Sequence, residues 1–317
     1  MSEPIRQNLI KPRALRSGSR LAVVSPASTP KAELVDAGIE RLRELGYEPV
    51  LYPSALVRGP LYYAGSLEAR LRDLHSAFAD RSIDGVICTR GGWGSAELLP
   101  YLDADLVRAN PKVFVGYSDH TSLHAWFARE AGLGTFYAPM VASDFGREDG
   151  VDLPSWKAAL HGSERWVLGT DDGLRVLRVG DAKGVLFGGC ASIVAESLGT
   201  PYAMQAPTRN GILFVEDIGT KPYQWDRHLL HLRYGGLLKR VKGVVFGDVE
   251  KCVDDEREAA LLEAAILHNL RDFDGPIAIG LRCGHVHGAN ISLPLGVQAE
   301  LVLGTDVELR ILESAVC

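Results

Sequence analysis

Short apolar runs alternate with amphipathic segments along the first half of the chain. The apolar runs are too continuous for a sheet with one wet face, and they predict strands buried on both sides. Four such runs are present: 20–25, 49–52, 85–89 and 112–115. Between them, residues 31–45 and 67–79 carry apolar side chains at intervals of three and four, which is typical of helices that cover a sheet. The pattern predicts an open, parallel α/β domain.

The second half of the chain is less regular. Apolar strand-like runs and two helical stretches alternate there without a fixed period, so the strand order stays open. The strand-like runs are 211–215, 241–246, 297–303 and 307–312, and the helical stretches are 225–234 and 256–269. Residues 143–181 are acidic and Gly-rich around a possible short helix after Pro154, which indicates a connecting segment. We expect two domains, 1–165 and 166–317.

The composition of the chain limits the kinds of molecule that the protein is expected to bind. The 317 residues include 34 Lys and Arg against 40 Asp and Glu, and the basic residues are scattered, so neither nucleic acid nor a membrane surface is an expected partner. The longest apolar stretch, 184–195, is too short to cross a bilayer, and residues 1–15 hold no apolar run like that of a secretory signal. Five cysteines without a CxxC pair fit reduced thiols. We expect a cytoplasmic protein that handles a small molecule.

A serine stands at a predicted strand-to-helix junction. The run 113–116 ends in glycine, Tyr117-Ser118-Asp119 follows, and a helical pattern begins at Leu123. Such a turn exposes a serine hydroxyl above the sheet edge and sets backbone N–H groups where they can stabilise an oxyanion. The match to G-x-S-x-G is incomplete because His120 replaces the second glycine. The alternative is that Ser118 or Asp119 only caps the helix.

Three glycines within four positions follow another predicted strand, in Arg90-Gly-Gly-Trp-Gly94. Glycines allow a backbone to approach a ligand closely, and this loop and Ser118 lie at the same carboxyl edge of the predicted sheet. The run matches neither G-x-G-x-x-G nor the P-loop, so a dinucleotide-dependent oxidoreductase is a weak rival. A tight turn without function remains the alternative.

An acid and a loop histidine complete the candidate chemistry. The run 211–215 is followed by Glu216 and Asp217, and His285 and His287 stand among glycines. In the order Ser118, Glu216, His285 these groups permit a hydrolytic triad, in which the histidine accepts the serine proton and the acid orients it. The acids could instead simply face solvent. A metal site at the two histidines lacks a third ligand at recognisable spacing, so no metal is expected.

Ordered motifs across 23–301 resemble the LD-carboxypeptidases, or muramoyltetrapeptide carboxypeptidases, which are serine peptidases. The matching stretches are Tyr63–Ser66, Arg70, Asp73-Leu74, Arg90–Gly94, Pro111-Lys112, Gly116–Asp119, Thr121, Leu123-His124, Gly188-Gly189, Leu198–Pro201, Glu216-Asp217, Tyr223, Asp226-Arg227, Gly284-His285 and Pro294–Gly296. The resemblance implies a flavodoxin-like N-terminal domain with an open parallel sheet and a β-rich, barrel-like (swivelling) C-terminal domain. It also implies a homodimer that needs no cofactor.

Carried onto this sequence, the resemblance makes Ser118 the nucleophile, Glu216 the orienting acid and His285 the general base. The backbone N–H groups of Gly92 and Asp119 would form the oxyanion hole. The implied reaction releases terminal D-alanine from muropeptide tetrapeptides during peptidoglycan recycling.

Arg90 and Trp93 are further candidates for substrate binding, and Arg233 is a second candidate for the terminal carboxylate. Three departures from the family pattern qualify substrate fit: Trp93 in place of a frequent tyrosine, the segment 219–221, and Met140 after Pro139. Two alternatives stay open. One is a related serine peptidase that cleaves peptidyl or aminoacyl nucleotide antibiotics, and the other is a non-catalytic two-domain binding protein.

Overall fold

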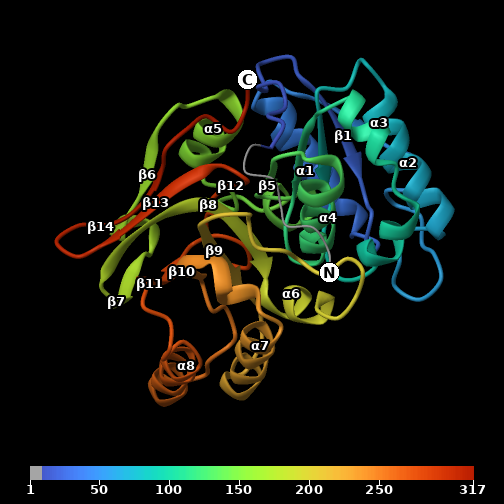
Figure 1. The fold of residues 1–317 in the computed structure, drawn as a ribbon. Coiled ribbons are helices and arrows are strands. Elements are labelled where there is room, and N and C mark those ends of the chain that lie inside the picture. The colour runs from blue at the N-terminus through green and yellow to red at the C-terminus, as the bar shows by residue number, and fades with distance from the viewer. Residues whose placement is uncertain (1–8) are drawn as a thin grey trace.

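Two β-sheets form the framework of the molecule (Figure 1). The structure is a computed structural model and describes residues 9–317. The first sheet has the order β12-β5-β4-β3-β1-β2, in which β1 to β5 run parallel and β12 is antiparallel to β5. Its strands are β1 (Arg20–Val24), β2 (Glu48–Leu51), β3 (Gly85–Cys88), β4 (Val113–Gly116), β5 (Thr135–Tyr137) and β12 (Leu293–Leu295). The predicted parallel α/β domain is confirmed.

The helices of the first half are interleaved with these strands. They are α1 (Ala32–Glu44), α2 (Leu67–Ala79), α3 (Ala104–Ala109), α4 (Thr121–Trp126) and α5 (Leu153–His161), with the short 3₁₀ or π segments η1 (Ser95–Tyr101), η2 (Ser118–His120), η3 (Phe127–Ala131), η4 (Val141–Phe145) and η5 (Thr170–Asp172). The helix predicted over 67–79 is present with the same bounds. It begins at Leu67 because Ser66 caps it: the Ser66 hydroxyl accepts the Ala69 N–H at 3.3 Å.

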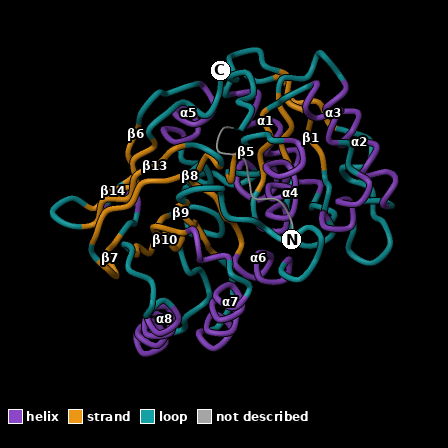
Figure 2. Tube along the Cα trace, viewed as in Figure 1, coloured by secondary structure: helices purple, strands orange, loops and turns teal. Residues whose placement is uncertain are grey.

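The second sheet has eight strands in the order β6-β14-β13-β8-β9-β10-β11-β7. Strands β8 to β11 are parallel, and the others join them antiparallel. They are β6 (Trp166–Leu168), β7 (Arg175–Arg178), β8 (Gly180–Cys190), β9 (Gly211–Glu216), β10 (Val241–Gly247), β11 (Ile277–Leu281), β13 (Gln298–Leu303) and β14 (Val307–Ile311). Helices α6 (Ala191–Ser197), α7 (Pro222–Tyr234), η6 (Leu237–Arg240) and α8 (Glu256–Asn269) accompany this sheet (Figure 2).

The segment expected to connect the halves is itself folded. Residues 143–181 contain α5 and the strands β6 and β7, which are the two edges of the second sheet. In the other direction β12, which lies far along the chain, completes the edge of the first sheet. The expected connecting segment therefore supplies both edge strands of the second sheet, and a strand from the second half of the chain supplies one edge of the first. The division at residue 165 stays a prediction.

One apolar core joins the sheets. A single cluster of buried side chains includes Phe114 of β4 and Phe214 of β9, and a second cluster around Trp225 and Phe246 lies between the second sheet and its helices. All five cysteines are free thiols, four of them buried. Within residues 9–317, no helix has the length and apolar character needed to span a membrane.

Candidate active site

Ser118 lies at a strained turn between β4 and α4. Its φ is +64°, in the left-handed region that residues with a side chain rarely adopt. The neighbouring Asp119 holds this turn: its buried carboxylate accepts the Ser95 N–H at 2.9 Å, and its carbonyl accepts the Ser95 hydroxyl at 2.8 Å. Burial raises the pKa of Asp119 to about 6. The serine elbow expected from the sequence is therefore formed, and it is tied to the start of η1.

The Gly-rich loop faces this elbow. A Cβ added to Gly91 would lie 2.9 Å from Ser118 Cβ and 3.3 Å from the Asp119 amide nitrogen, so only glycine allows this approach. Gly92 follows with φ +100°, and the Arg90 guanidinium lies beside it, 3.3 Å from where a Cβ would be. The backbone nitrogens of the predicted oxyanion hole thus belong to two loops in contact at Ser118.

Glu216 and His285 form a hydrogen-bonded pair. Glu216 ends β9, and its Oε2 accepts both the Nδ1–H of His285, at 2.8 Å, and the His285 backbone N–H, at 2.9 Å. The carboxylate is fully buried, whereas the imidazole is 15% exposed. Gly284 has φ +95°, and a Cβ there would lie 2.4 Å from Glu216 Cδ, so the histidine loop reaches the acid because this position is glycine.

The pair is polarised toward the ionised forms. Burial acts to raise the pKa of Glu216, but the His285 charge and the hydrogen bonds from His285 and Tyr137 outweigh it, and the net pKa lies below the ordinary value. Burial acts to lower the pKa of His285, but the Glu216 carboxylate outweighs it and the net pKa is raised. Glu216 therefore orients the imidazole and favours its protonation, as the acid of a triad does.

Tyr137 connects Ser118 to this pair. Its buried hydroxyl accepts the Ser118 backbone N–H at 3.0 Å and donates to Glu216 Oε1 at 2.5 Å. Among the described residues, Ser118 is therefore connected to Glu216 through the Tyr137 phenol, and no hydrogen bond joins Ser118 Oγ to His285 Nε2. Tyr117, next to the serine, packs edge-on against the His285 ring with centroids 5.2 Å apart.

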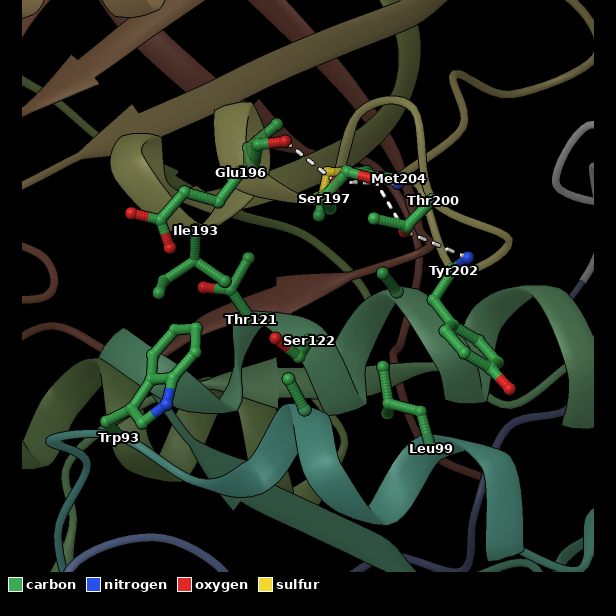
Figure 3. A pocket seen from close by; sticks show the side chains of 13 residues that line it. Trp93, Leu99, Thr121, Ser122, Ile193, Glu196, Ser197, Thr200, Tyr202 and Met204 are labelled. Carbon is green, nitrogen blue, oxygen red and sulfur yellow. Dashed lines mark hydrogen bonds between the residues drawn. The ribbon is translucent and has the colours of Figure 1, made fainter.

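The remaining sequence candidates divide into two groups. Trp93 follows Gly92 and lines a cavity together with Thr121 and Ser122 of α4 (Figure 3). Arg233 lies elsewhere, paired with Asp272 near the end of α7.

His287 does not join His285: its Nε2 lies 2.9 Å from Glu250 Oε1, in a separate contact. Within the described 9–317, no three His, Cys, Asp or Glu side chains are grouped to hold a metal ion.

Two contributors were not found from sequence. Tyr117 stands between the predicted strand and Ser118, and Tyr137 stands before Ala138 and Pro139. No local pattern at either position marks a phenol that meets a carboxylate, and the carboxylate that Tyr137 meets is 79 residues away. The available signal was indirect: Tyr137 ends a short β-type segment at the same sheet edge as Gly116, with which it pairs.

Known proteins resemble the chain throughout. Sequence models of the LD-carboxypeptidase N-terminal and C-terminal domains match residues 21–138 and 183–301. A probable murein peptide carboxypeptidase of Bacillus subtilis is 36% identical over 294 residues, covering 92% of this chain and 91% of the relative.

Solved structures agree with these matches. The muramoyltetrapeptide carboxypeptidase of Oxalobacter formigenes superposes with a TM-score of 0.82 at 28% identity, covering 93% of this chain and 99% of its own. An MccF-like protein of Bacillus anthracis gives 0.87 at 27%, covering 96% and 99%. With matching domains, matching fold and a relative this similar over nearly its whole length, the chain belongs to the LD-carboxypeptidase family.

Proposed function

We propose that this protein is a serine carboxypeptidase that hydrolyses the amide between an L-configured residue and a terminal D-alanine of a muropeptide tetrapeptide. The observation that carries the proposal is the hydrogen-bonded series from Ser118 through Tyr137 and Glu216 to His285. The series starts at the backbone N–H of the serine and ends at the imidazole, which supports a role for these groups at one site. The names of the relatives from Bacillus and Oxalobacter support the choice of substrate.

In the proposed reaction His285 Nε2 accepts the Ser118 hydroxyl proton while Oγ attacks the carbonyl carbon. Glu216 holds Nδ1–H, so the lone pair of the neutral ring is on Nε2. The oxyanion forms beside the N–H groups of Gly92 and Asp119. When the C–N bond breaks, His285 gives its proton to the leaving amine. Water, deprotonated by the same nitrogen, then hydrolyses the acyl-enzyme and restores the Ser118 hydroxyl.

Arg90 is the proposed partner of the terminal carboxylate. A carboxypeptidase binds a free carboxylate one residue beyond the scissile carbonyl, and the Arg90 guanidinium lies beside Gly92 of the oxyanion loop. A guanidinium can hold a carboxylate with two parallel hydrogen bonds. Trp93, three residues farther on, would form part of the neighbouring wall.

The test is mass spectrometry of the tetrapeptide L-Ala-γ-D-Glu-L-Lys-D-Ala after incubation with the protein. We expect loss of one alanine, and a fall on the order of 10⁶-fold in turnover for Ser118→Ala, as for other serine triads. Ser76→Ala, which removes an exposed hydroxyl of α2, serves as the matched control. Turnover by Ser118→Ala close to that of the native protein would contradict the assignment.

A second substrate belongs in the same assay because an MccF-like structure resembles this chain. If aminoacyl-sulfamoyl adenosine is cleaved and the tetrapeptide is not, the protein acts on aminoacyl nucleotides instead. If peptides bind without turnover and a serine-directed inhibitor leaves Ser118 unlabelled, the protein is a binding protein.

We further infer a cytoplasmic homodimer without a cofactor. The family resemblance suggests the dimer, and the free thiols agree with a reducing compartment. Analytical ultracentrifugation tests the first point, and cell fractionation tests the second.

A further inference from the structure

Asn290 closes the base of the loop that carries His285, which spans residues 284–290. Its side chain is fully buried, and its Oδ1 accepts the backbone N–H of Gly284, the residue before the histidine, at 2.9 Å. Between these two positions the loop is exposed at Gly288. Gly284 is itself buried, so this side chain satisfies an N–H that water does not reach. One end of the histidine loop is therefore held by a side chain from the other end.

The backbone of Asn290 lies against the first half of the chain. Its N–H donates to the Gly150 carbonyl, and its carbonyl accepts the Asp152 N–H, both at 3.0 Å. Between these contacts Val151 forms a parallel bridge with Asn290. The three partners lie between η4 and α5. The histidine loop is thus attached to this segment as well as to Glu216 of the second sheet.

The other end of the Asn290 amide meets a carboxylate. Its Nδ2 donates to Oδ1 of Asp144, a fully buried residue of η4, at 3.2 Å. The hydroxyl of Tyr117, which precedes Ser118, lies 3.5 Å from the same oxygen, and the Arg147 guanidinium lies 3.1 Å from it. A second set of polar contacts therefore connects the serine elbow to the histidine loop, apart from the phenol and carboxylate described above.

An amide satisfies both neighbours of this side chain. The Gly284 N–H requires an acceptor and the Asp144 carboxylate requires a donor, and asparagine presents one of each in a single planar group. Asn290→Asp would set two carboxylates face to face, and an apolar side chain would leave the Gly284 N–H without a partner. The attachment of the loop therefore depends on the chemistry of this side chain, beyond the volume that it fills.

We propose that Asn290 is a positioning residue that fixes His285 relative to Ser118. Glu216 orients the imidazole from the second sheet, whereas Asn290 holds the histidine loop to η4 and to the segment that follows it. Asn290 acts through the imidazole and transfers no proton itself. The inference rests on the proposed function, since it concerns the general base of that reaction.

The experiment measures kcat and KM on L-Ala-γ-D-Glu-L-Lys-D-Ala for Asn290→Ala, for Asn290→Asp and for a double variant that adds Asp144→Asn to the latter. We expect each single variant to lose on the order of 10²-fold, mainly in kcat, as a displacement of ~1 Å at a reacting group can cause. The double variant again places an amide against a carboxylate, so it should recover about tenfold. Asn210→Ala, which removes an exposed amide before β9, is the matched control and should keep the native values.

The pKa of the His285 imidazole, followed by NMR, separates positioning from packing. Burial acts to lower this pKa, and the carboxylates of Glu216, Asp217 and Asp144 raise it above the ordinary value. A loop that moves away from Glu216 loses the largest of these charges. In Asn290→Ala we therefore expect the pKa to fall toward the ordinary value of an imidazole. Urea unfolding of the same variant measures the loss of stability separately.

The outcomes separate the inference from the proposed function. A less stable Asn290→Ala with native kcat and native His285 pKa, or a double variant no more active than Asn290→Asp, overturns the positioning role. If the native protein hydrolyses no peptide, the proposed function fails, and the His285 pKa in Asn290→Ala still decides the inference. If the variants do not fold, amide exchange in the native protein decides it: a Gly284 N–H that exchanges as fast as that of Gly288 overturns it, and a protected one supports it.

Discussion

Replacing Tyr137 by Phe is the sharpest test of the connected site. The substitution keeps the buried ring and removes one oxygen, which accepts the Ser118 N–H at 3.0 Å and donates to Glu216 Oε1 at 2.5 Å. Both partners lose a hydrogen bond at once: Glu216 is fully buried and cannot reach water easily, whereas Ser118 is half-buried. The change therefore acts on the elbow and on the acid together.

The size of the effect follows from these two contacts. An unsatisfied buried N–H costs about 1–3 kcal/mol, and a hydrogen bond to a charged group contributes about 1.5–3 kcal/mol. Because Ser118 is half-buried, the first contribution lies in the lower part of its range, about 1–2 kcal/mol, and we expect the free energy of unfolding to fall by roughly 2.5–5 kcal/mol. If about 1.4–2.8 kcal/mol of this is also lost from the transition state, kcat/KM falls about 10- to 100-fold. Glu216 still holds His285 through Oε2, so activity is reduced and not abolished.

A pH profile separates a positioning role from simple packing. Without the phenol donor the Glu216 carboxylate is more basic and holds the His285 proton more firmly, so the acidic limb of kcat/KM should move to higher pH. Urea unfolding and kcat/KM from pH 5 to 9 give both readouts, with Tyr234→Phe, an exposed tyrosine of α7, as the control. A less stable variant with the native pH profile and native kcat/KM would refute the reasoning.

Three further predictions concern the same pair of loops. Because Glu216 raises the pKa of His285 and the base must be neutral, the acidic limb of kcat/KM should have its midpoint above 6.5; a midpoint below that value would contradict the assignment. Glu216→Gln should reduce kcat by about 10⁴-fold, with an unchanged near-ultraviolet dichroism spectrum, and a fall of less than tenfold would remove the acid from the mechanism. Gly284→Ala should lower the free energy of unfolding in urea by roughly 2–4 kcal/mol, since it combines a left-handed φ of +95° with a Cβ 2.4 Å from Glu216 Cδ; Gly288→Ala, with φ +81° but open space around it, should cost less.

Much of the fold was predictable where the chain carries its own signal. The apolar runs 20–25 and 85–89 became β1 and β3, and the stripe over 67–79 became α2, because local pattern and burial agree there. Strand β8 was missed, since four glycines in Gly180–Cys190 weaken the strand signal. Strand β12 has only three residues and includes Pro294, and its partner β5 is more than 150 residues earlier. No local rule can indicate such a pairing.

The candidate site, like the fold, could be predicted from the sequence only in part. Ser118 and the Gly-rich loop were indicated by the strand-to-turn pattern, which the structure shows as a strained elbow against Gly91. The residue types permitted a triad of Ser118, Glu216 and His285, and family resemblance gave each its role, but the contact between Glu216 and His285 depends on the loop between β11 and β12 and could not be predicted locally. Tyr137 could not be found, since its role depends on the register of β5 beside β4. Residue type and spacing predict the chemistry available, while the tertiary fold decides which groups meet.

The loop that carries His285 leaves one sheet and enters the other. Strand β11 precedes it in the second sheet, and β12 follows it in the first, where Leu293 pairs with Tyr137. His285 therefore lies in a loop whose two ends are held by strands of different sheets. Sliding of one sheet past the other would stretch this loop, so the two anchored ends oppose a displacement of the imidazole. Under the proposed mechanism, successive turnovers would then begin with the proton acceptor already in position, without a large rearrangement between them.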